Sequence, residues 1–225
     1  MNWILGIDTS STELGIGLAN NGRCIAGFSR YVRYSHAELI AEGIEFILKT
    51  AKIGPADIDT IAIATGPGSF TGLRIGIAFV KGFCLEPPVR ILPVSSLESV
   101  AIGSNIHHQP IVIAFDARRD TIFWARFHSN GHRILRKTED ACAPAKEFQS
   151  IVSKEDIVIT DTLGYTKSSV FDFLKERPQA YSIDQYPVQR GLACARKGMQ
   201  SCDNESWISV EELTPRYLSK AYAEA

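Results

Sequence analysis

The stretch that decides the fold runs from Ile61 to Gly82 and reads IAIATGPGSFTGLRIGIAFVKG. It begins as a buried apolar strand, turns through Gly66, Pro67 and Gly68, and continues as a helix. Glycine adopts backbone angles that other residues resist, proline sets the turn, and serine is a preferred N-cap, so Ser69 is expected to open the helix. The sequence therefore predicts a strand, a tight turn and a helix at the centre of the fold.

The helix predicted after this turn has very little polar surface. From Phe70 to Cys84 its only charged residues are Arg74 and Lys81, which are seven apart and share one stripe. A helix that is apolar nearly all round cannot leave one face in water. Small residues that would let another helix approach closely stand in two i,i+4 pairs, Gly72 with Gly76 and Ala78 with Gly82. The helix is either central to a large core or covered on its outer side by a partner, and the sequence leaves both open.

Composition narrows the class of protein. The 225 residues carry a formal net charge of −1, so no overall basic field indicates nucleic acid or membrane binding, although RNA contact through a partner stays open. The five cysteines form no CxxC pair, which argues against a disulfide framework or a zinc site. The N-terminus lacks the features of a signal peptide, and no apolar run reaches the length of a membrane helix. We therefore expect a cytoplasmic protein.

Two halves of the sequence repeat one pattern. In each half an apolar strand ends in an aspartate, and an Asn-containing hairpin turn follows: Asp8 precedes Asn21 by thirteen residues and Asp116 precedes Asn130 by fourteen. The predicted strands of the first half are 3–8, 14–19, 23–32, 58–64 and 90–94, with helices 36–52 (capped by Ser35) and 70–84. The second half repeats them as strands 111–115, 121–127, 132–138, 156–160 and 180–183, with helices 143–152 and 166–177.

Two copies of β-β-β-α-β-α-β predict an α/β fold with a duplicated mixed sheet, arranged as two RNase H-like lobes. We place the N-terminal lobe at residues 1–104 and the C-terminal lobe at 105–225, which includes an extra helix at 187–200 and a docked tail. Right-handed crossovers put both helices of a copy on the same face of its sheet. The helices that begin at His36 and Phe70 should thus be neighbours. Together they show more apolar surface than one sheet can cover, which predicts a partner face.

The turn Asp8-Thr9-Ser10-Ser11 is the weak candidate for nucleotide binding. An acidic residue followed by a hydroxyl-rich turn at the head of a duplicated fold resembles the phosphate-binding turn of the actin, sugar-kinase and Hsp70 superfamily. Ser10 stands where those ATP-using proteins commonly have glycine, the turn after Asp116 contains no glycine, and the chain has no Gly-Gly pair. These departures argue against ATP chemistry by this chain alone. The alternative is that Asp8 caps its own turn.

Other constellations that carry chemistry are missing or ambiguous. The GPGSFTG turn could bind an anion at a helix N-terminus, but it is not a P-loop, and a purely structural turn is preferred. His128 and His132 flank an Asn-Gly hairpin, so they would not share a metal-binding face, and Cys84 at a helix end should be inert. No Ser-His-Asp arrangement or nucleophile elbow can be argued from the spacing. We assign no catalytic residue and no metal ligand.

Five segments along the whole chain together resemble one family. They are ILGIDTSSTELGIGL (4–18), TGPGSFTGLRIGIAFVKGF (65–83), PVSSLESVA (93–101), AFDARRDTIFWARF (114–127) and PRYLSK (215–220). In this order they are similar to the bacterial TsaB (YeaZ) family, and GPGSFTGLRIG is the most specific of them. The resemblance implies an actin-like (ASKHA) fold and a place in the pathway that makes threonylcarbamoyladenosine in tRNA.

The resemblance also implies a role and partners. Members of this family are degenerate relatives of the catalytic subunit TsaD, which holds the metal and transfers the threonylcarbamoyl group, and TsaE is an ATPase that joins the complex. The implied role is a non-catalytic scaffold or activator whose first two helices pair with those of TsaD, or with a second copy as a homodimer. Contact with tRNA is implied only through the complex. A metal-binding HxxxH on a helix, as in TsaD, is absent here, and no residue arrangement supports the family's older description as a glycoprotease.

These expectations define a partner interface and leave two functions open. The residues expected at the interface are His36, Leu39, Ile40, Gly43, Phe46, Ile47, Gly72, Leu73, Arg74, Gly76, Ile77 and Val80. Which of the two apolar helix stripes faces the partner stays open. No cofactor is expected in the isolated chain, while an adenine nucleotide at an interface of the complex stays open. The alternative function is an ATP-dependent phosphotransferase or hydrolase of the actin-like class that acts alone.

Overall fold

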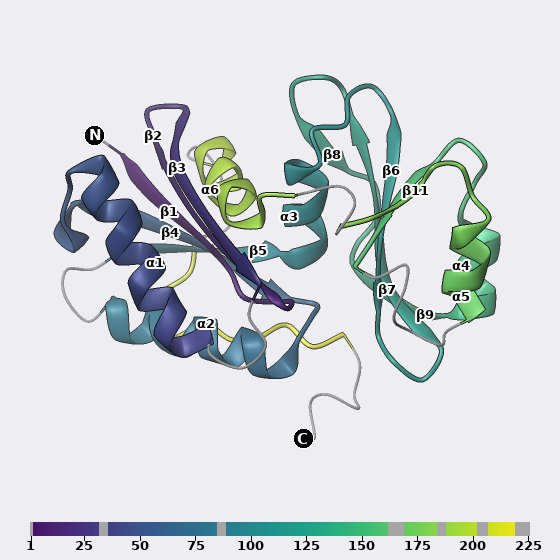
Figure 1. The fold of residues 1–225 in the computed structure, drawn as a ribbon, viewed down its shortest axis with the longest axis horizontal. Helices are drawn as coiled ribbons and strands as arrows, with labels where there is room; N and C mark the ends of the chain where they lie inside the picture. The colour runs from purple at the N-terminus through teal and green to yellow at the C-terminus, as the bar shows by residue number, and fades with distance from the viewer. Residues whose placement is uncertain are drawn as a thin grey trace. The chain divides into compact units, whose positions relative to one another are not determined.

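The computed structural model describes residues 2–31, 36–84, 89–161, 169–183, 188–201 and 207–218. The chain divides into two compact α/β units (Figure 1). The first unit comprises Met1–Ser99 together with Gln189–Arg216, and the second comprises Val100–Val188 together with Tyr217–Ala225. The predicted duplicated mixed-sheet fold is therefore confirmed, since each unit is built on its own mixed sheet.

The described part of the first unit contains a five-stranded sheet in the order β3-β2-β1-β4-β5. Its strands are β1 (Trp3–Asp8), β2 (Glu13–Asn20), β3 (Arg23–Tyr31), β4 (Ile58–Gly66) and β5 (Arg90–Ser95). The first three strands pair antiparallel, and β4 and β5 run parallel to β1. Asn21 and Gly22 both have positive φ, of 47° and 78°, as the predicted tight hairpin between β2 and β3 requires.

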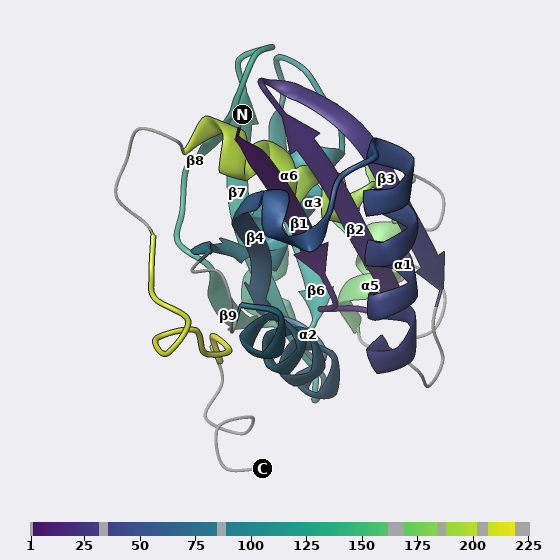
Figure 2. The ribbon, with the colours of Figure 1, turned by 90° about the vertical axis from the view of Figure 1, so that its left-hand side faces the viewer.

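Two helices cover one face of this sheet. They are α1 (His36–Ala51) and α2 (Phe70–Phe83), which pack against each other as predicted and lie in front of the strands in Figure 2. Their apolar residues join Leu5, Ile7 and Ile63 of the sheet in one core. Ser69 caps α2 as predicted, because its Oγ accepts a hydrogen bond of 3.2 Å from the Gly72 N–H. Ser35, the predicted cap of α1, lies outside the described residues.

The opposite face of the same sheet carries α6 (Arg190–Gln200), which lies behind the strands in Figure 2. Cys194 and Ala195 of this helix share a core with Ile4 and Ala62. The structure differs here from the predicted division of the chain, because we placed the C-terminal helix in the second lobe and it packs in the first. Apolar residues point to both faces of β1 and β4, so the sheet needs a helix on each side.

The second unit repeats the plan. Its described strands are β6 (Pro110–Asp116), β7 (Thr121–Ser129), β8 (Ile134–Arg136), β9 (Ala141–Pro144), β10 (Ile157–Thr160) and β11 (Ala180–Ser182). They form a sheet in the order β11-β10-β6-β7-β8, with β9 also paired to β7. Helices α4 (Ala145–Ile151) and α5 (Ser169–Lys175) contribute Phe148 and Leu174 to a core beneath one face.

Three elements between and within the copies were not predicted. Helix α3 (Ser96–Gly103) follows β5, and β9 occupies residues where the predicted helix 143–152 was to begin. A short 3-10 helix, η1 (Pro55–Asp57), precedes β4. Short elements bury too few residues for a clear apolar period to show in the sequence, which explains why all three were missed.

The described part of the C-terminal tail is docked, as predicted, but residues up to Arg216 belong to the first unit and not to the second lobe in which we placed them. Ile208 bridges Ile91 of β5, where its N–H donates to the Ile91 carbonyl at 3.0 Å. Leu213 is fully buried in the core beneath α1 and α2, and the Arg216 N–H donates to the Thr65 carbonyl at 2.7 Å. None of the helices in the described part of the chain has the length and apolar character needed to cross a membrane.

Candidate functional site

The turn after β1 is held by its own aspartate. The first carboxylate oxygen of Asp8 accepts hydrogen bonds from the Ser10 N–H at 2.9 Å and from the Ser10 hydroxyl at 2.6 Å. A short-range contact of this kind is the self-capping arrangement expected of an aspartate two residues before a serine. The alternative that Asp8 caps its own turn is thus confirmed.

The second carboxylate oxygen of Asp8 binds partners that are distant in sequence. It accepts a hydrogen bond of 2.8 Å from the Ser99 hydroxyl of α3 and one of 3.1 Å from Nε of Arg190 at the start of α6. Arg190 Nη2 also donates to the Ser10 hydroxyl at 2.8 Å. Asp8 is fully buried and Arg190 is 1% exposed, so this is an ion pair inside the protein. We call Asp8, Ser10, Ser99 and Arg190 the Asp8 network.

Glycines bring α6 close enough for Arg190 to reach Asp8. A Cβ added to Gly191 would lie 2.3 Å from the Ile16 nitrogen, and one added to Gly15 would lie 2.7 Å from the Gly191 nitrogen. Gly6 and Gly17 meet α6 in the same way. The helix backbone therefore lies directly on β1 and β2, where any larger side chain would hold it away.

Neither Ser99 nor Arg190 was predicted from the sequence. The signal that could have found the close helix is the run of glycines at alternate positions of the first hairpin, since Gly15 and Gly17 face the same side of β2. Nothing in the sequence pairs Arg190 with Asp8, which stands 182 positions earlier.

Thr9 and Ser11, the other candidate residues of this turn, have packing and local roles. Thr9 faces α2. A Cβ added to Gly76 would lie 2.3 Å from the Thr9 hydroxyl, and a Cβ added to Gly72 would lie 2.1 Å from the carbonyl oxygen of Thr9. The Ser11 hydroxyl accepts a hydrogen bond of 3.1 Å from the Glu13 N–H. The Ser69 N–H donates to the Ser10 carbonyl at 2.7 Å, so the GPGSFTG turn packs on the Asp8 turn as the structural interpretation expects.

A metal-bound nucleotide does not fit the Asp8 network. An ionised carboxylate offers about four lone-pair positions, and the contacts named above occupy all four. Its negative charge is already balanced by Arg190. A phosphate-bound metal ion would have to displace one of these buried donors before it could coordinate Asp8.

The matching turn of the second unit is built differently. Asp116 at the end of β6 is half-buried, and its Oδ1 accepts a hydrogen bond of 2.8 Å from the Arg118 N–H. Arg118, Arg119 and Asp120 are exposed and all have positive φ, of 63°, 51° and 58°. The absence of glycine from this turn leaves side chains at positions where a phosphate-binding turn presents its backbone N–H groups.

Helix α2 does not present the expected interface residues to a partner, which corrects part of the predicted interface. Gly72, Leu73, Gly76, Ile77 and Val80 are buried by the chain itself, so they cannot reach another molecule. They face inward because the sheet and Thr9 cover this side of the helix. Arg74 alone of the predicted α2 set is exposed, and its guanidinium lies 3.7 Å from the centre of the Phe70 ring.

Helix α1 shows the same division. Ile40, Gly43 and Ile47 are buried against the sheet, and Leu39 is half-buried. Phe46 is 57% exposed and packs at 6.3 Å, between ring centres, against Phe28 of the edge strand β3. His36 is the first residue of the helix, and its side chain lies outside what the structure describes.

The outer side of α2 is a stripe of small residues and one cation. Its members, Thr71, Arg74, Ala78 and Gly82, are exposed and recur every three or four positions. A Cβ added to Gly82 would meet no atom within 4 Å. We call these four residues the outer α2 face. The sequence left two alternatives for this helix, burial in a large core or cover by a partner. One side of the helix is core, and the other side is uncovered within the described chain.

The thiols and histidines that the structure describes have no metal-binding geometry. No group of three or more His, Cys, Asp and Glu side chains in the described ranges could hold a metal ion. Burial raises the pKa of the Cys84 thiol to about 11. Burial, with a smaller effect of the Asp8 carboxylate, raises the pKa of Cys194 well above its usual range. Both thiols therefore stay protonated and unreactive near neutral pH, as predicted for Cys84.

The duplicated β-β-β-α-β-α-β order, with an aspartate ending the first strand of each unit, defines the class of protein. It is the two-lobe α/β fold of the actin-like (ASKHA) class. The solved structure of YeaZ from Pseudomonas aeruginosa has this arrangement: it is 22% identical, with a TM-score of 0.78, and the match covers 97% of this chain and 100% of that chain.

Sequence comparison identifies the family. The model of the family described as TsaD, tRNA N6-adenosine threonylcarbamoyltransferase, matches residues 30–175. The tRNA threonylcarbamoyladenosine biosynthesis protein TsaB of Bacillus subtilis is 27% identical over 99% of this chain and 96% of its own length. TsaB of Escherichia coli is 33% identical over 60% of this chain and 59% of its own length. The chain belongs to the family that this model describes and, with these relatives, to the TsaB (YeaZ) family.

Proposed function

We propose that this chain is a non-catalytic subunit of the machinery that makes N6-threonylcarbamoyladenosine in tRNA. Membership of the family supports this assignment, because its relatives from B. subtilis and E. coli are named for this biosynthesis. The saturated Asp8 network supports the non-catalytic role, since its carboxylate is not available to a metal ion. The chain then contributes by binding the subunit that carries out the transfer.

The partner of this subunit is a TsaD-like catalytic protein, and the docking site is the outer α2 face together with the neighbouring exposed side of α1. The observation that carries the proposal is that α2 keeps a small-residue stripe uncovered although the rest of the helix is apolar core. Ala78 and Gly82 would let a partner helix approach its backbone closely, and Arg74 adds a directional polar contact.

The same face also serves a second copy of this chain, so homodimer and heterodimer compete. A TsaE-like ATPase joins the complex, and tRNA is contacted only through the assembled partners. The chain has no nucleotide site of its own, and any adenine nucleotide of the complex lies at an interface that a partner completes.

Titration of the purified chain with a TsaD-like subunit of the same organism tests the docking site. We expect Ala78→Glu to weaken pairing by about 10-fold or more, because a buried, unpaired carboxylate is costly at an interface. Isothermal titration calorimetry measures the affinity. The melting temperature of the variant should stay unchanged, because Ala78 is exposed in the single chain.

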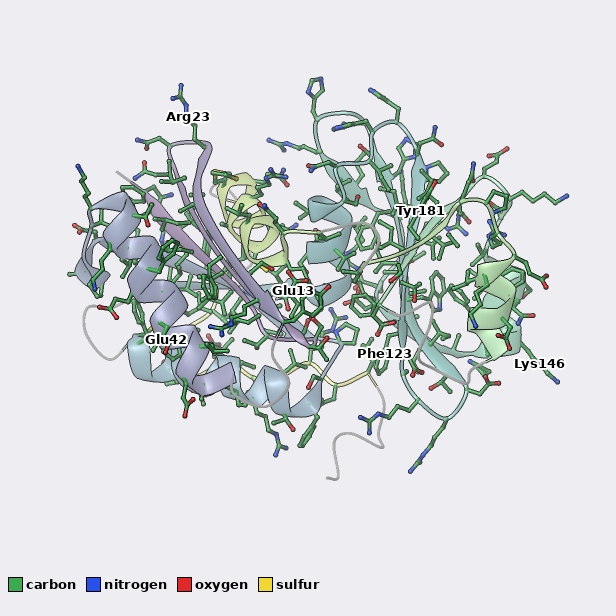
Figure 3. All side chains as sticks on the ribbon, viewed as in Figure 1. Glu13, Arg23, Glu42, Phe123, Lys146 and Tyr181 are labelled. Carbon is green, nitrogen blue, oxygen red and sulfur yellow. The ribbon has the colours of Figure 1, made fainter. Side chains whose placement is uncertain are left out.

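Lys146→Glu is the matched control, because it also places a glutamate on an exposed helix. Lys146 lies on α4 of the second unit and points into solvent in Figure 3. The affinity of the Lys146→Glu variant for the TsaD-like subunit should equal that of the unchanged chain. Wild-type affinity for both Ala78→Glu and Gly82→Glu would show that the outer α2 face is not the docking site. ATP turnover by the chain alone would instead favour an autonomous enzyme.

A further inference from the structure

We infer that Arg190 is the resident cation of the Asp8 site, and that its guanidinium closes the first lobe to metal-bound nucleotide. The turn after β1 is the place where the resemblance to actin-like proteins implies phosphate binding. The residues found there do not fit such a group, and the misfit has a definite structural cause. An arginine from α6 occupies the position beside the carboxylate that a ligand's cation would need.

The geometry around the carboxylate leaves no place for a second cation. Two donors of Ser10 bind one oxygen of Asp8, and Ser99 and Arg190 bind the other, at distances between 2.6 and 3.1 Å. Arg190 Nη2 also binds the Ser10 hydroxyl, so the guanidinium contacts the turn as well as the carboxylate. A planar, multiply bonded guanidinium is more directional than a point charge.

Arg190 cannot leave this position as an ordinary side chain could. It is the first residue of α6, and the next residue, Gly191, is pressed against the backbone of β2. Farther along the helix, Gly198 meets the side chain of Ile4, where an added Cβ would lie 2.7 Å from Cγ2. Opening the site therefore requires separation of α6 from the sheet, with exposure of the core that contains Cys194 and Ala195.

A second ion pair supports the same attachment. Lys197 of α6 donates to Oε1 of Glu98 at 2.8 Å, and Glu98 is adjacent to Ser99 in α3. Both cations of this region thus come from α6, and the carboxylates they bind belong to β1 and α3. The helix supplies the positive charge that makes a buried aspartate tolerable in the first lobe.

The first test uses the unchanged chain. Differential scanning fluorimetry measures its melting temperature with and without 5 mM Mg-ATP, which is about the concentration that saturates a weak nucleotide site. We expect no shift in the melting temperature.

The second test uses Arg190→Ala, which removes the guanidinium and leaves space for a small cation. We expect the melting temperature to fall by roughly 10 °C, because an uncompensated buried carboxylate remains. Methylguanidinium at low millimolar concentration should restore at least half of this loss, and methylammonium should restore much less.

Arg196→Ala is the matched control on the same helix, where the side chain is half-buried and its Nε lies 3.3 Å from Cys24 Sγ. It should melt near the unchanged chain and should not respond to methylguanidinium. The double variant Asp8→Asn/Arg190→Ala should also lose the response, because the carboxylate that binds the cation is gone.

Two results would overturn the inference. One is stabilisation of the unchanged chain by Mg-ATP, and the other is a folded Arg190→Ala chain that methylguanidinium does not stabilise. If Arg190→Ala does not fold, refolding from urea with methylguanidinium decides the question, since recovery of folded protein supports the inference and no recovery contradicts it. None of these measurements involves a partner, so they stand or fall separately from the proposed docking function.

Discussion

Two aspartates end the first strands of the two units, and their surroundings differ. Asp8 is fully buried, and donors from its own turn, from α3 and from α6 satisfy it. Asp116 is half-buried, and its Oδ1 accepts a bond from the turn that follows it, while its N–H donates to Asp161 at 3.2 Å. The same topological position therefore carries a buried ion pair in one unit and a partly hydrated carboxylate in the other.

The difference shows that repeated topology does not repeat chemistry. Each turn follows the first strand of its unit, β1 or β6. That strand pairs antiparallel with the next strand on one side and parallel with a later strand on the other. The first unit receives a later segment, Gln189–Arg216, which returns to its sheet. That segment supplies Arg190, and its close packing depends on glycines in β1 and β2. The surroundings of each aspartate thus depend on what packs onto the sheet after the copy is complete.

The largest expected effect comes from neutralising each aspartate in turn. Asp8→Asn should lower the free energy of unfolding by about 3 kcal/mol or more, because it leaves Arg190 charged and buried without its partner. Asp116→Asn should change it by less than about 1 kcal/mol, because asparagine can still accept the bond from Arg118 and the site is partly hydrated. Urea denaturation measures both. Equal losses would mean that the buried pair does not distinguish the two turns.

A smaller effect is expected from adding one methyl group to each of two helical glycines. Gly191→Ala should destabilise the first unit by about 2 kcal/mol, because its Cβ would lie 2.3 Å from the Ile16 nitrogen and would force α6 off the sheet. Gly82→Ala, the matched control on α2, should stabilise the chain by about 0.5 kcal/mol, because that Cβ meets no atom within 4 Å. Thermal unfolding of both variants checks the signs. A neutral Gly191→Ala would show that the close approach is unnecessary.

The smallest effect is a difference in the rate at which two thiols, one near each turn, are chemically labelled, and it needs no mutation. Cys194 lies beside the Asp8 network, and burial raises its pKa well above the usual range. Cys142 lies on β9, near the second turn, and pairs with Phe123 of β7. It is exposed, although partial burial also raises the pKa of its thiol. Iodoacetamide at pH 8 should therefore modify Cys142 and leave Cys194 unmodified until the chain unfolds.

Mass spectrometry of timed samples follows this labelling. Because a raised pKa delays formation of the thiolate, reaction at Cys142 should accelerate as the pH increases above 8. Cys84 serves as an internal reference, since a pKa of about 11 leaves about one thiolate per thousand molecules at pH 8. Labelling of Cys194 as fast as Cys142 would mean that α6 does not stay on the sheet.

Much of the fold was predictable because it rests on local patterns. Apolar runs located β1 and β4, alternation located β2, and the Asn-Gly signals located the hairpins. The matched spacing from Asp8 to Asn21 and from Asp116 to Asn130 showed the duplication. Ser69 was predicted as the cap of α2 because capping depends on residues only three positions apart.

The candidate sites were less predictable for a different reason. An apolar period shows that α2 has a side that avoids water, but it does not show which residues the chain itself covers. Gly72 and Gly76 were expected at a partner surface because they are small, yet they are small because Thr9 packs against them. The residues that face outward on the same helix are Arg74, which was in the predicted interface set, and Ala78, which was noted as a small residue but left out of that set.

The amino-acid sequence by itself determined the order of the elements, their duplication and the family, since all three are written in short-range patterns and in segments of specific sequence. The tertiary structure alone decided which side of α2 is core, where α6 packs and which cation binds Asp8. Contacts such as the one between Asp8 and Arg190 join residues 182 positions apart. Their formation depends on the close packing of complete elements, which no local window of sequence records.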